Sequence, residues 1–173
     1  MSGWWTGAFV VQWILLVVLS VVVVALAREV GALHLRLGPL GALEIDGEGP
    51  PLGEAVGPRP ALGLDGTATV VGGPGSSRLV LFVSRTCPIC EQLLPSIPAA
   101  ARAAGLVPQV VADPGLERAY DVPGVPFLVV LDRFGVAWAK GTVNNLEQIE
   151  GLADTASRRM AEDSTEDLAE AHR

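Results

Sequence analysis

The chain has 173 residues, and its 19 acidic side chains outnumber its 12 basic ones, which gives a formal net charge of −7. This acidic balance argues against nucleic-acid binding, because such a chain repels the phosphate backbone. The hydrophobic share of 50% is raised by one apolar segment near the N-terminus. The sequence contains no internal repeat and no phosphate-binding loop, and we expect no cofactor.

Residues 8–27 are expected to form a single transmembrane helix, preceded by a short N-terminal flank, residues 1–7. The run carries no charged side chain, and only Gln12 and Ser20 are polar. At about 1.5 Å per residue, a helix of this length crosses the ~30 Å hydrocarbon core, so membrane lipid is its expected partner. A core helix of this length would show a polar face, and a cleaved signal peptide would have a shorter apolar region behind a positively charged flank.

Residues 28–65 are expected to form a juxtamembrane segment and a Gly/Pro-rich tether. Glycine and proline are crowded between residues 38 and 77, where they favour turns and flexible loops. One short strand is expected at 67–71, within a folded domain predicted to cover residues 66–160. The tether would let this domain reach other proteins near the membrane.

The only two cysteines, Cys87 and Cys90, are three positions apart and follow the strand-like run 79–83. A pair at this spacing can form a disulfide and open again by exchange, so a redox centre is the leading interpretation. A structural staple is one alternative, although a bridge that closes so short a loop stabilises a domain little. A zinc half-site is the other, but a structural site needs four ligands, and His34 and His172 lie far away in sequence. We therefore expect no metal.

Residues 88–104 are expected to form a helix that begins at the cysteine pair, because apolar residues recur there at helical spacing. Cys87 would then lie at the helix N-terminus, where free N–H groups and the helix dipole favour a thiolate. We therefore expect Cys87 to be the attacking sulfur and Cys90, one turn further on, to be shielded and to resolve the mixed disulfide. Pro95 and Pro98 should kink the helix or break it in two.

The segment 122–127, Val-Pro-Gly-Val-Pro-Phe, opens another apolar run. A proline at the start of a core strand is tolerated only where its missing N–H does no harm, and a cis Val125–Pro126 bond would suit a close approach to the cysteine pair. The Val125 backbone would then be exposed for pairing with an extended client peptide. Val125 and Pro126 are therefore the expected substrate-binding residues. Further strands are expected at 106–112, 128–131 and 136–140, with a turn at 132–135.

The C-terminal residues, 161–173, are rich in Glu and Asp and poor in large apolar side chains. This composition predicts a disordered acidic tail.

The order of these features resembles the thioredoxin fold, an α/β fold in which helices flank a mixed central sheet. Within that fold, the segment FVSRTCPICEQLLP at 82–95 resembles the MauD family, thioredoxin-like accessory proteins of methylamine dehydrogenase assembly. The stretches ALAREVGALH at 25–34 and GPLGAL at 38–43 are similar to the opening of the same family. The resemblance extends from about residue 8 to about residue 155.

The resemblance implies a membrane-anchored thiol–disulfide oxidoreductase that reduces, forms or isomerises disulfides in client proteins. By position, Cys87 is the nucleophile, Cys90 the resolver and Pro126 the cis-proline. The implied partners are client thiols or disulfides and an integral-membrane redox partner. MauD is implicated in disulfide chemistry on the small subunit of a periplasmic amine dehydrogenase, and this client does not carry over to every relative. Thioredoxins proper have a tryptophan before the first cysteine and a buried carboxylate six residues before it, whereas Thr86 and Leu81 stand here.

Two other functions compete with this interpretation. A non-catalytic assembly factor would hold a client or a membrane partner, and its cysteines would be incidental. A peroxiredoxin-like peroxidase would have a proline seven residues before its reactive cysteine and a Thr or Ser three residues before it. Val80 and Ser84 occupy these positions, so only the second half of that pattern matches.

Two signals for membrane orientation oppose each other. Residues 1–7 contain no Lys or Arg, whereas Arg28 and Arg36 follow the span, and the positive-inside rule would place the domain in the cytoplasm. The MauD resemblance implies an extracytoplasmic domain, in a compartment where disulfides persist. We predict a single-pass protein of the cell membrane with an extracytoplasmic catalytic domain.

Overall fold

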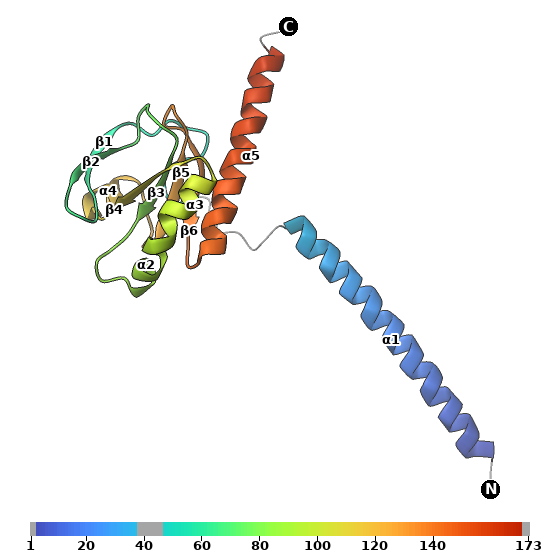
Figure 1. Cartoon of the computed structure of the whole chain (residues 1–173). Helices are drawn as coiled ribbons and strands as arrows, with labels where there is room; N and C mark the ends of the chain where they lie inside the picture. The colour runs from blue at the N-terminus through green and yellow to red at the C-terminus, as the bar shows by residue number, and fades with distance from the viewer. Residues whose placement is uncertain (1–2, 38–46, 171–173) are drawn as a thin grey trace. The chain divides into compact units, whose positions relative to one another are not determined.

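The protein is described by a computed structural model over residues 3–37 and 47–170 (Figure 1). Contacts divide the chain into an N-terminal unit, which contains the single helix α1 (Gly3–Leu37), and a C-terminal unit with all the other elements. Within α1, the stretch Gly7–Val24 is long and apolar enough to cross a membrane, and none of it is buried. This makes α1 a candidate membrane span, as predicted, although the helix continues beyond the predicted end at residue 27.

The C-terminal unit is built on a four-stranded mixed sheet in the order β4-β3-β5-β6. The central strands β3 (Arg78–Phe82) and β5 (Phe127–Leu131) are antiparallel, and their apolar side chains are buried on both faces. The outer strand β4 (Val107–Val111) runs parallel to β3, and β6 (Ala137–Thr142) runs antiparallel to β5. The sequence predictions of these strands are confirmed to within two residues at each end.

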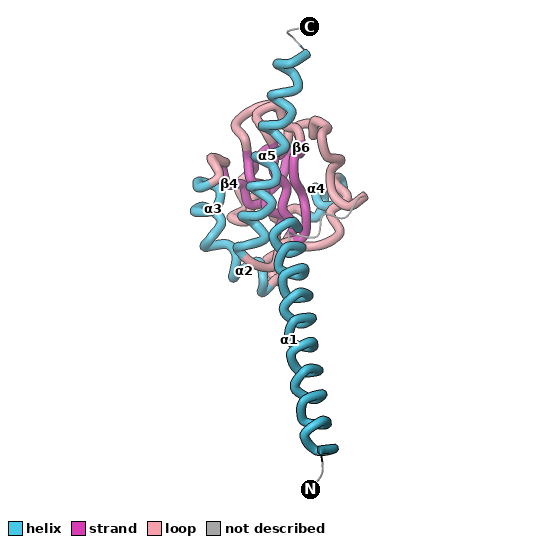
Figure 2. The backbone as a smooth tube through the Cα atoms, turned by 90° about the vertical axis from the view of Figure 1, so that its right-hand side faces the viewer, coloured by secondary structure: helices cyan, strands magenta, loops and turns pink. Residues whose placement is uncertain are grey.

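One face of the sheet is covered by α2 (Pro88–Leu93), the 3-10 turn η1 (Leu94–Ser96), α3 (Ile97–Ala103) and α5 (Leu146–Glu170), and Figure 2 shows α5 lying across the strands. The predicted helix at 88–104 is thus broken at its internal prolines. Pro95 falls in η1 and Pro98 in the first turn of α3, where its missing N–H costs no helical hydrogen bond. The apolar cluster under these helices contains Cys90.

The opposite face is covered by the hairpin of β1 (Arg59–Leu62) and β2 (Ala68–Val71) and by α4 (Pro114–Ala119). The Phe82 and Tyr120 rings meet edge to face in this second cluster, with centroids 6.1 Å apart. The Tyr120 hydroxyl lies 3.3 Å from the carbonyl oxygens of both Gly57 and Val71, which ties the hairpin to the sheet. Burial raises the pKa of Tyr120 above its ordinary value.

Asp113 explains why the short helix α4 begins where it does and how it holds the hairpin. Its Oδ1 accepts hydrogen bonds from the N–H groups of Gly115 and Leu116, at 2.8 and 3.2 Å. Its Oδ2 accepts the N–H of Leu62 in β1 at 3.2 Å. One carboxylate therefore caps a helix and fixes the neighbouring strand.

The prediction of a Gly/Pro-rich tether is wrong for residues 47–65, which include β1 at 59–62. Residues 28–37, the start of the predicted juxtamembrane segment, belong to α1. A segment that we call the strap, residues 47–56, is bonded to the domain through N–H groups of Gly49, Gly53 and Val56. Glycine and proline do exclude long regular elements here, but their backbone groups pair with the domain instead of with water. Residues 38–46 lie outside the described residues.

The prediction of a disordered tail is wrong for residues 161–170, since α5 continues to Glu170. The described side chains at 161–165 are all exposed. A low apolar content therefore identified a segment whose side chains at 161–165 lie outside the core, but Ala, Glu and Leu are good helix formers and extend a helix that packing has already nucleated. Residues 171–173 lie outside the described residues.

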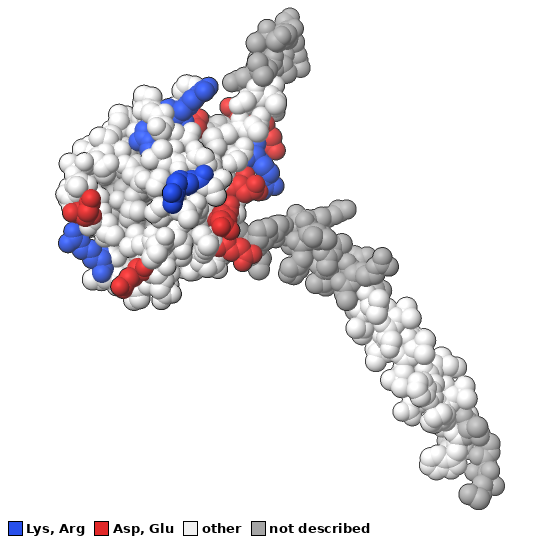
Figure 3. All heavy atoms as spheres, viewed as in Figure 1, with Lys and Arg blue, Asp and Glu red and all other residues white. Residues whose placement is uncertain are grey.

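Acidic side chains on the face shown in Figure 3 are concentrated along α5, where Glu147, Glu150 and Asp154 are exposed. Arg158 pairs with Asp154 at 3.2 Å on the same exposed helix. This surface would repel a nucleic-acid backbone, in agreement with the net charge.

Candidate active site

The cysteine pair lies at the carboxyl end of β3, where the chain turns into α2. The Ser84 hydroxyl oxygen accepts the N–H of Thr86 at 3.3 Å, and the Ser84 carbonyl accepts the N–H of Cys87 at 3.2 Å. These bonds make a tight polar turn, after which Cys87 takes the N-cap position of α2 and Pro88 its first turn. The sequence prediction for the position of Cys87 is confirmed.

Cys87 and Cys90 are joined by a disulfide, with their Cα atoms 5.3 Å apart. The two sulfurs differ in exposure, because Cys87 is partly exposed whereas Cys90 is only 1% exposed. The N–H of Cys90 donates to the Cys87 Sγ at 3.1 Å. A donor at this place would also stabilise negative charge on that sulfur once the disulfide is open.

The surroundings of Cys90 are apolar. Cys90 belongs to an apolar cluster that contains Leu81, Leu93 and Leu128. Leu81, at the position where thioredoxins carry a carboxylate, is fully buried in this cluster. Among the described residues, Lys140 is the only buried polar or charged side chain, so no buried carboxylate is available to accept the proton of the Cys90 thiol.

Val125 and Pro126 lie beside the exposed sulfur. The Val125 carbonyl oxygen is 3.9 Å from the Cys87 Sγ, and the Val125–Pro126 peptide bond is cis. Pro126 is buried, and its carbonyl accepts the N–H of Val143 at 3.2 Å. The structure thus brings all four residues singled out in the sequence to one place, although Cys90 and Pro126 are shielded from solvent.

Sequence reasoning missed a contact between the hairpin and the loop before Cys87. Arg85 Nη2 donates to the carbonyl of Leu64 at 3.2 Å, in the turn between β1 and β2. That turn is closed by Asp65, whose Oδ1 accepts both the N–H and the hydroxyl of Thr67. These hydrogen bonds, with the hydroxyl contributing most, lower the pKa of Asp65. The glycine and threonine beside Asp65 could have indicated a turn from the sequence, but not that Arg85 binds to it.

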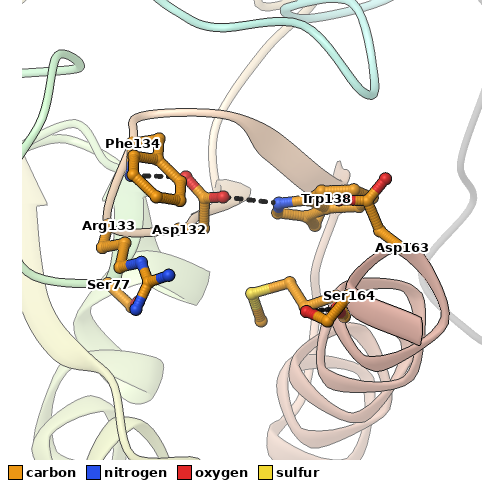
Figure 4. A pocket seen from close by; sticks show the side chains of 8 residues that line it. Ser77, Asp132, Arg133, Phe134, Trp138, Asp163 and Ser164 are labelled. Atoms are coloured by element: carbon orange, nitrogen blue, oxygen red, sulfur yellow. Dashed lines mark hydrogen bonds between the residues drawn. The ribbon is translucent and has the colours of Figure 1, made fainter. Parts of the chain in front are cut away.

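A hollow of about 490 Å³ lies at the other end of the sheet, where β5 ends and β3 begins (Figure 4). Its wall includes Phe134 and Trp138, and the indole Nε1 of Trp138 donates to Asp132 Oδ2 at 3.1 Å. Neither cysteine lines it. Among the described residues no group of three or more His, Cys, Asp or Glu side chains could hold a metal ion. The partly exposed Cys87 thus lies away from this hollow.

No family model matches the chain. It is similar to the methylamine utilization protein MauD of Methylobacillus flagellatus, with 31% identity over 180 residues, which cover 89% of this chain and 87% of that protein. The MauD proteins of Methylophilus methylotrophus and Methylorubrum extorquens are 31% and 30% identical over 89% and 84% of this chain, and over 85% and 83% of their own lengths.

Among solved structures, a putative thiol:disulfide interchange protein DsbE from Chlorobium tepidum is 20% identical, with a TM-score of 0.50 over 64% of this chain and 98% of that one. This likeness, together with the mixed sheet and flanking helices, shows the thioredoxin fold. The identity of 30–31% to MauD proteins, over 83–87% of their lengths, shows the family: the chain belongs to the MauD family.

Proposed function

We propose that this thioredoxin-like thiol–disulfide oxidoreductase works through attack by Cys87 and resolution by Cys90. The observation that carries the assignment is the unequal exposure of the two sulfurs. Only Cys87 is open to solvent, whereas Cys90 is 1% exposed. A client sulfur can therefore reach Cys87 without any opening of the fold. Cys90 is covered by the protein and can be reached by the neighbouring Cys87 sulfur but not by a client.

In the reducing direction, the Cys87 thiolate attacks one sulfur of a client disulfide. A bond forms between Cys87 and the client, the client disulfide breaks, and the released client thiolate takes up a proton. Cys90 then loses its proton and attacks the Cys87 sulfur, which forms the intramolecular disulfide and releases the second client thiol. Two electrons pass from the cysteine pair to the client, and the reverse sequence oxidises a client dithiol.

Val125 is proposed as the residue that holds the client strand during exchange. Its carbonyl is 3.9 Å from the Cys87 Sγ, so a peptide N–H bonded to this oxygen would lie beside the reacting sulfur. Pro126 would shape this loop without touching the client, since it is buried. Protein thiols or disulfides are the expected clients, and a protein of methylamine utilization is the first to test because of the relatives' name.

We further propose that α1 spans the cell membrane once and that the domain is extracytoplasmic, where disulfides persist. An integral-membrane dithiol or disulfide protein would return the cysteine pair to its starting state after each exchange. A non-catalytic assembly role is the competing function, and it does not need either sulfur.

The test is a trapping experiment in cells that express Cys90→Ser. Without Cys90 nothing displaces the client from Cys87, so we expect a long-lived mixed disulfide on a non-reducing gel that disappears on reduction. The matched control is Cys87→Ser, which keeps the buried sulfur and should trap nothing. If the wild type is active and Cys90→Ser traps no protein, the exchange mechanism is wrong. Full function of the double Cys→Ser variant would establish the non-catalytic role.

A further inference from the structure

Gly49 in the strap touches both ends of the loop that carries the Val125 carbonyl. At one end, the Gly49 N–H donates to the carbonyl of Asp121 at 2.8 Å. At the other end, the Gly49 backbone lies against the ring of Phe127, the first residue of β5. The loop 121–126 between these two points carries the carbonyl that faces Cys87.

The approach to Phe127 is so close that only glycine fits. A Cβ on Gly49 would lie 2.7 and 2.8 Å from two carbon atoms of that ring, and no real side chain tolerates such distances. Phe127 is 1% exposed and cannot swing into solvent. The φ of Gly49 is +71°, which also favours glycine. Any larger residue must therefore push the ring, and with it the start of β5.

Phe127 transmits a displacement directly to the candidate client site. It follows Pro126 in the chain, and its ring belongs to the cluster against which the Val125 and Val122 side chains pack. On the far side the loop is fixed by the bond from the Val143 N–H to the Pro126 carbonyl. The loop is therefore bonded at its start to the strap and to α4, and at its end to Val143 after β6.

We propose that Gly49 is a positioning residue for client binding, because the strap sets the place of the Val125 carbonyl relative to the Cys87 sulfur. This rests on the proposed function of that loop. It means that the segment joining the domain to the membrane helix is part of the exchange machinery. Gly49 touches no client itself and acts through Phe127 and Asp121.

Gly53 provides a matched control within the same strap. Its φ is +75°, and its N–H also donates to a carbonyl at 2.8 Å, that of Ala137. A Cβ on Gly53, however, would meet nothing within 4 Å. Gly49→Ala and Gly53→Ala thus impose the same backbone strain, and only the first displaces Phe127.

Two probes separate client docking from sulfur reactivity in the full-length protein, purified in detergent. Oxidised insulin must dock an extended segment beside Cys87, whereas the small disulfide 5,5′-dithiobis(2-nitrobenzoic acid) need not. For Gly49→Ala we expect the second-order rate with insulin to fall at least about tenfold relative to Gly53→Ala, since a misplacement of about an ångström can cost about a hundredfold in rate. The rate with the small disulfide should stay within about twofold, as this probe needs no positioning.

A purely structural glycine would lower the thermal midpoint and leave both rates per folded molecule unchanged. Equal insulin rates for the two alanine variants, or equal losses with both probes, would overturn the proposal. If Gly49→Ala does not fold, the double variant Gly49→Ala/Phe127→Leu, whose shorter side chain gives room, should fold and recover insulin reduction. Its failure to do so would also overturn the proposal. A wild type that reacts with neither probe would instead count against the proposed function.

Discussion

Resolution of the mixed disulfide by Cys90 should be slow at neutral pH and should accelerate as the pH rises. Cys90 must lose its proton before it can attack the Cys87 sulfur. It is 1% exposed and belongs to the apolar cluster on its face of the sheet. A thiolate in such surroundings is disfavoured, and no carboxylate is buried among the described residues to take the proton.

The size of the effect follows from the titration of a thiol. An ordinary cysteine is about 3% thiolate at pH 7, and burial reduces this fraction further. Below the midpoint of a titration the ionised fraction rises about tenfold for each pH unit. The resolving step should therefore become about tenfold faster between pH 7 and pH 8. The first attack should change less, because the start of α2 and the Cys90 N–H favour the thiolate form of Cys87.

Stopped-flow release of the thionitrobenzoate anion measures both steps on the reduced protein. One equivalent of 5,5′-dithiobis(2-nitrobenzoic acid) should release a first anion when Cys87 attacks its disulfide and a second when Cys90 displaces the remaining half from Cys87. The second phase should be slow and pH-dependent, and it should vanish in Cys90→Ser. A single phase, or a second phase whose rate is flat from pH 6.5 to pH 8.5, would refute the reasoning and indicate a proton acceptor near Cys90.

Four further outcomes are expected. Leu81→Asp, which puts a carboxylate into the Cys90 cluster, should accelerate the slow phase at pH 7, and the control Leu81→Asn should not. Equal rates of the slow phase in the two variants would show that a carboxylate at residue 81 does not take the proton of Cys90. Asp113→Ala should lower the free energy of unfolding by about 1–2 kcal/mol in urea, because it removes the cap of α4, and an unchanged midpoint would contradict this. Burial and, second, the charge of Asp113 raise the pKa of Glu117. The protonated form of Glu117 therefore stabilises the fold at pH values below the ordinary glutamate pKa, and this contribution is lost as the pH rises through the raised pKa. Glu117→Gln should therefore unfold at higher urea than the wild type at pH 7 but not at pH 3. A membrane-impermeant maleimide should label Cys87 in intact cells after mild reduction, and labelling only after lysis would place the domain in the cytoplasm.

The cysteine chemistry could be predicted from the sequence because it depends on local order. Cys87 and Cys90 belong to one turn of chain, and the strand before them and the prolines after them fix where α2 begins and ends. The absence of a carboxylate at Leu81 could also be predicted, since it needs only a count from the first cysteine. Only the packed structure shows that no other buried carboxylate among the described residues takes the place of the missing one.

The strap could not be predicted, and the reason is physical. Glycine and proline tell which backbone conformations are available, but not whether the backbone groups bond to water or to a distant strand. The bonds from Gly49, Gly53 and Val56 join partners that lie far away in the chain. The disordered tail was wrongly predicted because a low apolar content reports burial and not helix propensity.

The position of the Val125 carbonyl depends on residues from four separate parts of the chain. Cys87 faces it, Gly49 and Val143 hold the loop from either side, and Phe127 links the strap to the strand that follows. The sulfur of a Cys-x-x-Cys pair can be correctly placed while the carbonyl beside it is not, since only the former is fixed by local hydrogen bonds. The proposed role of Gly49 predicts that a change in the strap alters the reaction with a protein disulfide and not the reaction with a small one. For this reason reactivity toward a small disulfide and reactivity toward a protein disulfide should be measured separately throughout the family.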